Sequence, residues 1–314
     1  MGLRDGDVSV LAVPASHVTG LVAIILTMIN VSGTTVLMPV FKARAFLQLA
    51  AATKMTHTLI VPAMYNLCLL DPEFATFDLS HWRIGSFGGA PMPEATIERL
   101  AAILPNLTLI NAYGSTETTS PVTLLPSGEV AAHADTVGKV LPCADIVVMD
   151  DDGREVAPGE SGELWIAGPM VVPGYWNNPD ADRTAFHAGY WKSGDIGSID
   201  AQGYVRIHDR KKDMINRGGY KIYCIEVEGV LARHPQVIEC AVIGRPDPVL
   251  GERVHAVIVP RAADLDLGAL QAFCAQNLSD YKVPESFTLI ADALPRNANG
   301  KVLKTALREL AQLS

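Results

Sequence analysis

Short aliphatic runs alternate with longer amphipathic segments over the first 114 residues of the chain. A short run rich in β-branched residues predicts a strand, whereas apolar residues repeated at helical spacing predict a helix. The runs place strands at 8–13, 34–38, 58–61, 83–87 and 107–112. The segments between them place helices at 18–30, 43–54, 62–70 and 93–104. This alternation is typical of an α/β fold with a largely parallel sheet covered on both faces.

The pattern changes after residue 120. Short apolar runs are then separated by turns rich in Asp and Gly, such as 150–153 and 200–203, which predicts a small, mainly antiparallel β subdomain. We therefore expect an N-terminal domain at 1–208, with an α/β part at 1–120 and a β-rich part at 121–208.

The last third of the chain follows a charged segment at 209–213. It predicts a compact α+β domain at 214–314. Strands are expected near 237–243 and 254–259, and helices at 225–233, at 267–277 and after 302.

Composition and charge narrow the class of function. The chain of 314 residues is 49% hydrophobic and 19% charged, which is typical of globular domains. Its net charge of -9 and pI near 5.3 argue against nucleic-acid binding, which needs a basic footprint. The apolar run 18–31 is short for a membrane span, and no signal peptide is indicated. Five dispersed cysteines favour a reducing, cytoplasmic location.

Candidate chemistry first appears at Tyr113–Thr118, which reads Tyr-Gly-Ser-Thr-Glu-Thr and follows an apolar run. Gly114 would allow the backbone to approach a phosphate, the Thr116 hydroxyl would bind it, and the Glu117 carboxylate would be a ligand for Mg²⁺. An alternative is that Thr116 and Glu117 cap a helix at a strand-to-helix junction.

Four motifs in a fixed order resemble the adenylate-forming superfamily, which includes acyl-CoA synthetases, luciferases and peptide-synthetase adenylation domains. The resemblance covers nearly the whole chain. The motifs are Tyr113–Glu117; Gly162–Gly168 with Gly174–Pro179; Ser193–Asp195 with Asp209–Asp213; and Pro295–Lys301. The resemblance implies the fold of adenylate-forming enzymes, with the C-terminal domain as a lid.

The resemblance also implies a nucleotide site. Asp195 would accept the ribose hydroxyls with Arg210 as its donor partner, and Lys301 would stabilise the charge that gathers during adenylation. Lys301, Thr116 and Glu117 would be the catalytic residues. The ATP- or AMP-binding residues would be Gly88, Gly89, Ala90, Asn111, Ala112, Tyr113, Gly114, Thr116, Asp195, Arg210 and Lys301.

Each of these assignments has a plainer alternative. Asp195 would then be a turn residue, Arg210 would form a solvated surface pair with Asp213, and Lys301 would be an ordinary loop lysine. Gly88 and Gly89 would serve only close strand-to-helix packing.

Further roles concern the acid and CoA. The resemblance places His17, Gly114 and Ser115 at the acyl-binding site, although His17 is also compatible with a hydrogen-bonded core histidine. Lys212 would be the hinge of a large lid rotation, or simply a charge in a linker. Gly218 and Gly219 would let the pantetheine arm of CoA pass close to the backbone.

Two departures from the family pattern are expected to matter. Relatives begin with a further segment that carries a phosphate-gripping loop, and Val31–Val36 is not that loop because an apolar run follows it. We therefore expect the chain to lack the first part of the N-terminal domain that its relatives have, and to expose the apolar surface that this part would cover. Cys224 stands where many relatives have proline, and we expect only a local backbone effect.

The resulting hypothesis is a carboxylic acid:CoA ligase that uses Mg²⁺, with ATP and CoA as co-substrates. A small carboxylic acid would be its partner, and a homodimer is possible. One alternative is an adenylation domain that passes the acyl group to a carrier protein. The other is a non-catalytic module that holds AMP or an acyl ligand.

Overall fold

The computed structural model describes residues 2–89, 92–130, 132–262, 264–297 and 300–312. Contacts within the chain define two compact units. Among the described residues, the first unit comprises those within 2–193 and 197–207 together with Gly300, and the second comprises 194–196, 208–297 and 301–312. Each unit has its own hydrophobic core, so the two are described separately.

The first unit is built on a seven-stranded sheet in the order β2-β1-β3-β4-β5-β6-β7. The first five strands are mutually parallel, as the alternating pattern predicted. The strands are β1 (Val8–Leu11), β2 (Thr34–Leu37), β3 (His57–Leu59), β4 (Ile84–Gly88), β5 (Thr108–Gly114), β6 (Pro121–Leu124) and β7 (Lys139–Val140).

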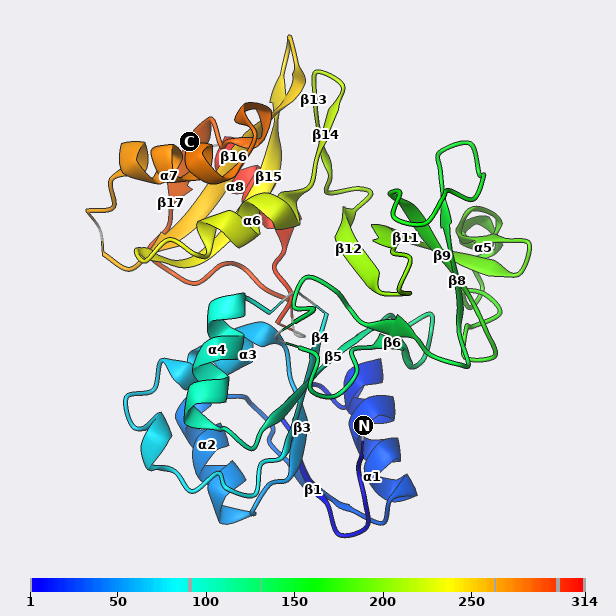
Figure 1. Ribbon diagram of the computed structural model, residues 1–314, viewed down its shortest axis with the longest axis vertical. Helices are drawn as coiled ribbons and strands as arrows, with labels where there is room; N and C mark the ends of the chain where they lie inside the picture. The colour runs from blue at the N-terminus through cyan, green and yellow to red at the C-terminus, as the bar shows by residue number, and fades with distance from the viewer. Residues whose placement is uncertain (1, 90–91, 131, 263, 298–299, 313–314) are drawn as a thin grey trace. The chain divides into compact units, whose positions relative to one another are not determined.

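Helices cover both faces of the parallel part. The helix η1–α1 lies on one face of the sheet and α2, α3 and α4 lie on the other (Figure 1). The elements are η1 (Thr19–Leu26), α1 (Thr27–Asn30), α2 (Ala43–Ala52), α3 (Pro62–Leu69), η2 (Phe74–Thr76) and α4 (Glu94–Ile103). All four predicted helices exist, but the first begins as a π-helix whose wider turns the apolar pattern did not indicate.

A second sheet forms most of the rest of the first unit, but residues 194–196 and 208–210 of its strands belong to the second unit. The order of this sheet is β10-β11-β9-β8, and β12 pairs with β11. The pairs β8–β9 and β10–β11 are antiparallel, as predicted for this region. The elements are β8 (Asp145–Met149), β9 (Gly162–Ala167), α5 (Pro179–Ala185), β10 (Phe186–His187), β11 (Tyr190–Ile199) and β12 (Val205–Arg210).

One boundary differs from the sequence-based expectation. We expected every strand after residue 120 to belong to the β subdomain. Instead, β6 and β7 extend the first sheet with antiparallel pairing. The pairing partner of such short strands depends on contacts far away in the sequence, which local patterns do not record.

The second unit combines a mainly antiparallel sheet with helices on its faces. The strand order is β14-β13-β16-β15, and β17 pairs with β16 in parallel. The elements are β13 (Ile215–Arg217), β14 (Tyr220–Ile222), α6 (Cys224–Leu231), β15 (Val237–Asp247), β16 (Gly251–Pro260), α7 (Leu267–Asn277), η3 (Asp280–Lys282), β17 (Ser286–Leu289) and α8 (Lys304–Gln312).

Two apolar clusters hold this unit together. Val227, Leu231 and Cys274 bring α6 and α7 onto one side of the β15–β16 pair, and Leu307 of α8 packs with Ile243 and Val257 on the other. Within the described part of the chain, no helix is both long enough and apolar enough to cross a membrane.

Candidate functional site

Two segments of the predicted nucleotide site leave the first sheet at the same edge. β4 and β5 are parallel neighbours, and Gly88 pairs with Ala112. Gly89 and the loop that begins after Gly114 therefore both follow carboxyl ends of strands, where α/β sheets usually bind ligands. Ala90, predicted to belong to this site, lies outside the described residues.

Backbone geometry alone explains why glycine stands at positions 88 and 89. A Cβ atom at position 88 would lie 2.3 Å from the carbonyl oxygen of Ala112, and Gly89 has a φ of +77°. Close packing thus requires glycine at 88, and the left-handed backbone favours it at 89. The Asn111 side chain is buried and donates from Nδ2 to the carbonyl of Thr136 at 3.0 Å. The nucleotide-binding roles of these residues stay predictions.

The loop after β5 is organised by Thr118, which sequence reasoning passed over as a site residue. This side chain is fully buried. Its hydroxyl accepts a hydrogen bond from the Ser115 N–H at 2.9 Å and lies 2.8 Å from the Ser120 carbonyl oxygen. The loop is therefore bent around one hydroxyl, while the Thr116 side chain is exposed.

The helix-capping alternative for Thr116 and Glu117 is wrong. No helix follows these residues, because the chain passes through a turn into β6 at Pro121. Gly114 is needed at the start of this turn, since a Cβ there would lie 2.7 Å from the Ser120 carbonyl oxygen. The hydroxyl and the carboxylate are thus presented by an irregular loop.

Glu117 is held by contacts to the second sheet of the same unit. Its Oε1 accepts a hydrogen bond from the Tyr175 hydroxyl at 3.0 Å, and the Trp191 indole N–H donates to that hydroxyl at 3.3 Å. Burial raises the pKa of Tyr175, and the Glu117 carboxylate acts in the same direction. The Val172 N–H also donates to the Glu117 carbonyl at 2.8 Å. The Gly174–Pro179 motif contains Tyr175 and was the signal that could have identified this partner.

This geometry is compatible with magnesium. Mg²⁺ is usually held by one or two carboxylates, with water and substrate phosphates completing its shell. Glu117 is a single, partly exposed carboxylate with one oxygen engaged by Tyr175. The described residues contain no group of three or more His, Cys, Asp or Glu arranged to hold a metal. Glu117 would therefore hold the ion together with nucleotide phosphates.

Asp195 and Arg210 form an ion pair in the second unit. Arg210 Nε lies 3.1 Å from Asp195 Oδ1, and the Asp195 side chain is 4% exposed. The alternative of an Arg210–Asp213 surface pair is not what the structure shows, because Asp213 pairs with Arg308 at 2.9 Å. A buried carboxylate beside a partly exposed guanidinium fits the predicted ribose-binding pair.

Lys301 lies within electrostatic reach of that pair. Its backbone is fixed by a reciprocal contact, in which Lys301 N donates to Asn297 Oδ1 at 3.0 Å and Asn297 N donates to the Lys301 carbonyl at 2.9 Å. Desolvation, followed by the Arg210 guanidinium, lowers the pKa of Lys301, while the Asp195 carboxylate opposes this shift. Lys301 thus senses the charges on Asp195 and Arg210.

The glycines predicted for CoA passage form a tight hairpin turn. Arg217 pairs with Tyr220 across β13 and β14, which leaves Gly218 and Gly219 as a two-residue connection. Both have positive φ, 58° and 92°, as such hairpins require. The turn explains both glycines without a ligand, so their role toward CoA stays a prediction. Lys212, the predicted hinge, is exposed.

His17 lies in the turn between β1 and η1. It is partly exposed, and its Nδ1 is 3.0 Å from the Thr19 hydroxyl. It is therefore not a buried core histidine. β1, which precedes His17, is the neighbour of β3 at the point where the strand order of the sheet changes direction. In doubly wound sheets, ligands usually bind beyond the carboxyl ends of the strands at such a point.

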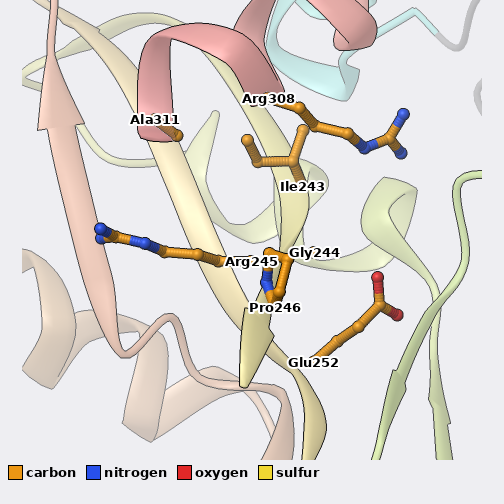
Figure 2. Close-up of a pocket in the computed structure, with 7 residues that line it drawn as sticks. All are labelled: Ile243, Gly244, Arg245, Pro246, Glu252, Arg308 and Ala311. Atoms are coloured by element: carbon orange, nitrogen blue, oxygen red, sulfur yellow. The ribbon is translucent and has the colours of Figure 1, made fainter. Parts of the chain in front are cut away.

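A pocket elsewhere in the second unit contains none of the predicted site residues. It is lined by Ile243, Gly244, Arg245, Pro246, Glu252, Arg308 and Ala311 (Figure 2). The guanidinium groups of Arg245 and Arg308 extend in opposite directions from it. They do not converge on one ligand, so this pocket adds nothing to the candidate site.

Comparison with known proteins decides the family. A family model described as AMP-binding enzyme matches residues 1–176, and one for the AMP-binding enzyme C-terminal domain matches residues 226–301. The chain belongs to the AMP-binding enzyme family. The resemblance inferred from the four motifs is confirmed, and so is the α/β fold class.

Curated relatives of the chain are CoA ligases. It is 38% identical to the long-chain-fatty-acid–CoA ligase FadD13 of Mycobacterium tuberculosis, over 98% of this chain and 60% of the relative. It is 35% identical to a feruloyl-CoA synthase of Amycolatopsis, over 98% of this chain and 62% of the relative. The chain thus spans about 60% of the length of these relatives.

Solved structures share the fold over nearly the whole chain. O-succinylbenzoate CoA synthetase MenE of Bacillus subtilis, in complex with ATP and magnesium, has a TM-score of 0.85 at 32% identity and covers 98% of this chain and 62% of its own. The anthranilate CoA ligase AuaEII, in complex with anthranoyl-AMP, has a TM-score of 0.92 at 26% identity, with 100% and 61% covered. The amide bond synthetase McbA of Marinactinospora thermotolerans has a TM-score of 0.88 at 29% identity, with 98% and 61% covered.

Proposed function

We propose that the chain acts in the AMP-forming ligation of a carboxylic acid to CoA. In the first half-reaction a carboxylate oxygen attacks the α-phosphorus of ATP, an O–P bond forms, and pyrophosphate leaves. In the second, the CoA thiolate attacks the acyl carbon, a C–S bond forms, and AMP leaves. The relatives named as CoA ligases support this reaction class, and a cytoplasmic location would supply both co-substrates.

The charge network in the second unit carries the proposal. Asp195 would accept the ribose hydroxyls, and Arg210 would orient that carboxylate. Lys301 would stabilise the charge that develops when the carboxylate attacks phosphorus, because a compact ammonium acts as a point charge. The Asp195–Arg210 ion pair, and the influence of both charges on Lys301, support this assignment.

The first unit would contribute the phosphate side of the site. The exposed Thr116 hydroxyl would bind a phosphate oxygen, and Glu117 would hold Mg²⁺ with the polyphosphate. When bound, magnesium would neutralise phosphate charge. The Tyr175 hydroxyl engages one oxygen of Glu117, so the other oxygen would be the ligand for the ion.

The remaining assignments concern the base, the acid and the acceptor. Tyr113 would lie against adenine, and His17 and Ser115 would border the acid. Lys212 would be the pivot for a change between the half-reactions. We favour free CoA over a carrier protein because the curated relatives are named for CoA, although the likeness to an amide bond synthetase shows that acceptors vary among proteins of this fold.

The second half-reaction gives the sharpest test, because it needs no grip on the β- and γ-phosphates. The 314-residue chain would be given synthetic oleoyl- and feruloyl-adenylates with CoA, because these acids belong to the classes in the names of the two curated relatives. We expect one of them to yield a thioester and AMP in a CoA-dependent manner. Thioester and AMP would be quantified by liquid chromatography with mass spectrometry.

A matched variant separates the two steps. Lys301→Met should reduce ATP-dependent adenylation by at least about 100-fold, since one preorganised electrostatic donor commonly contributes that much. Its rate with supplied acyl-adenylate should change less than about threefold. Formation of ADP, or product formation without CoA, would contradict the ligase. Tight AMP binding without any turnover would favour the non-catalytic module instead.

A further inference from the structure

Asp209 is a buried carboxylate that connects the chain before Lys212 with the chain after it. Only 2% of its surface is exposed. Its Oδ1 accepts a hydrogen bond from the Arg210 N–H at 2.7 Å, and its Oδ2 accepts one from the N–H of Cys224. A buried carboxylate needs such donors to offset its lost hydration. The end of β12 is thereby fastened to the first residue of α6.

Further contacts hold the intervening residues as a compact turn. The N–H groups of Asp213 and Met214 both donate to the Arg210 carbonyl, at 2.9 and 3.0 Å. The Cys224 thiol donates to the Asp213 carbonyl at 3.1 Å. Arg308, which extends from α8 in Figure 2, pairs with the Asp213 carboxylate. Residues on both sides of Lys212 are therefore tied to the same unit.

The donor to Asp209 Oδ2 is the Cys224 N–H, which makes no hydrogen bond within helix α6. Cys224 is the first residue of α6, and the first N–H groups of a helix have no partner within it. Tyr223, which precedes it, is extended, with φ -88° and ψ 115°. Proline fits the first position of a helix after an extended residue. Cys224→Pro would thus remove this N–H while preserving the helix.

We propose that the hydrogen bond from the Cys224 N–H to Asp209 is a latch that must open before the chain can turn about Lys212. A turn of the backbone at Lys212 would displace the donor from the acceptor, because Asp209 precedes Lys212 in the chain and Cys224 follows it. The buried carboxylate then loses its donor from α6. The latch holds the arrangement in which Lys301 lies near Asp195 and Arg210, and so controls passage from the first half-reaction to the second. The inference rests on the proposed function, which supplies the reason for the turn.

Limited proteolysis tests the latch without substrate. Trypsin cleaves after Lys211 and Lys212, both of which are exposed but lie in the compact turn. Cleavage needs a local opening whose population grows as the latch weakens. We expect Cys224→Pro to raise the rate of cleavage at these two bonds about tenfold, measured by mass spectrometry on the 314-residue chain at low trypsin concentration. Cys224→Ala keeps the N–H and should stay within about twofold of the unmodified chain.

Asp209→Asn removes the carboxylate from the other side of the latch. It should also accelerate cleavage several-fold, and the double variant should cleave no faster than Cys224→Pro alone, because both changes break one bond. If far-UV circular dichroism shows that Cys224→Pro does not fold, Asp209→Asn alone decides. Unchanged cleavage in Asp209→Asn, or equal acceleration in Cys224→Ala and Cys224→Pro, would overturn the latch. Since no ligand is present, a failed ligase assay would leave this result intact.

Discussion

At the scale of single residues, Asp195, Arg210 and Lys301 make a network with more positive than negative charge. Asp195 is nearly inaccessible to solvent, so its carboxylate depends on Arg210 for compensation. Asp213 also acts on the Lys301 ammonium, but its carboxylate is paired with Arg308. With Asp195 paired to Arg210 as well, the ammonium groups of Lys301 and of nearby Lys212 are the surplus positive charge. A surplus positive charge beside the carboxylate that is proposed to accept the ribose hydroxyls is the arrangement expected where a phosphate anion binds.

Asp195→Asn tests this network through nucleotide affinity. The amide offers one acceptor oxygen where the carboxylate offers two, and Arg210 loses its counter-charge. We expect the dissociation constant for AMP to rise at least about tenfold, which corresponds to about 1.4 kcal/mol. Isothermal titration calorimetry on the 314-residue chain provides the measurement.

Asp200→Asn is the matched control for that experiment. Asp200 also pairs with an arginine of β12, Arg206, at 2.7 Å, but it lies in the turn after β11. Its substitution should leave the AMP affinity within about twofold. Equal losses in both variants would mean that the Asp195 effect reflects damage to the sheet rather than a lost ribose contact.

At the scale of elements, what could be predicted from the sequence depends on the range of the interactions. Strands β1 to β5 and the helices between them were predicted correctly, because the alternation of aliphatic runs and amphipathic segments is local and repeated. The hairpin β13–β14 and the short strand β17 were missed because three or four residues carry no clear period. Side-chain contacts such as Tyr175–Glu117 join residues 58 positions apart. Motif chemistry named Glu117, and another motif contained its partner Tyr175, but no local pattern indicated that the two side chains meet.

A buried histidine within the parallel sheet gives an element-scale prediction for pH. His57 on β3 is completely buried, with Ser9 Oγ 3.1 Å from its Nδ1. Burial lowers the pKa of His57 to about 4. Between the usual histidine pKa and this value, the unfolded chain binds a proton that the folded chain does not, so stability falls as the pH falls. We expect a loss of about 2 to 3 kcal/mol from pH 7 to pH 4.5 from this residue.

Urea unfolding of two histidine variants isolates that contribution. His57→Asn should lower stability at pH 7 and flatten its dependence between pH 7 and pH 4.5. His81, which is exposed on the same unit, is the control, and His81→Asn should retain the slope of the unmodified chain. A slope that is unchanged in His57→Asn would show that other groups produce the pH dependence.

At the scale of the whole molecule, the two units have separate cores and different optical signals. Phe46, Tyr65 and Trp82 are in the core of the first unit, whereas Val227 and Leu231 belong to a core of the second. All four tryptophans, at 82, 165, 176 and 191, are in the first unit. Tryptophan fluorescence therefore reports unfolding of the first unit, and far-UV circular dichroism reports both.

This asymmetry allows the independence of the units to be measured with a pair of cavity-forming substitutions. Leu307 of α8 and Leu100 of α4 are both fully buried, and either leucine-to-alanine change should destabilise its own unit by about 2 to 5 kcal/mol.

The expected signals follow if each unit unfolds as its own cooperative body. Leu307→Ala should then shift part of the circular dichroism transition and leave the fluorescence midpoint unchanged. Leu100→Ala should shift the fluorescence midpoint. A common shift of both signals in Leu307→Ala would show that the chain unfolds as one body.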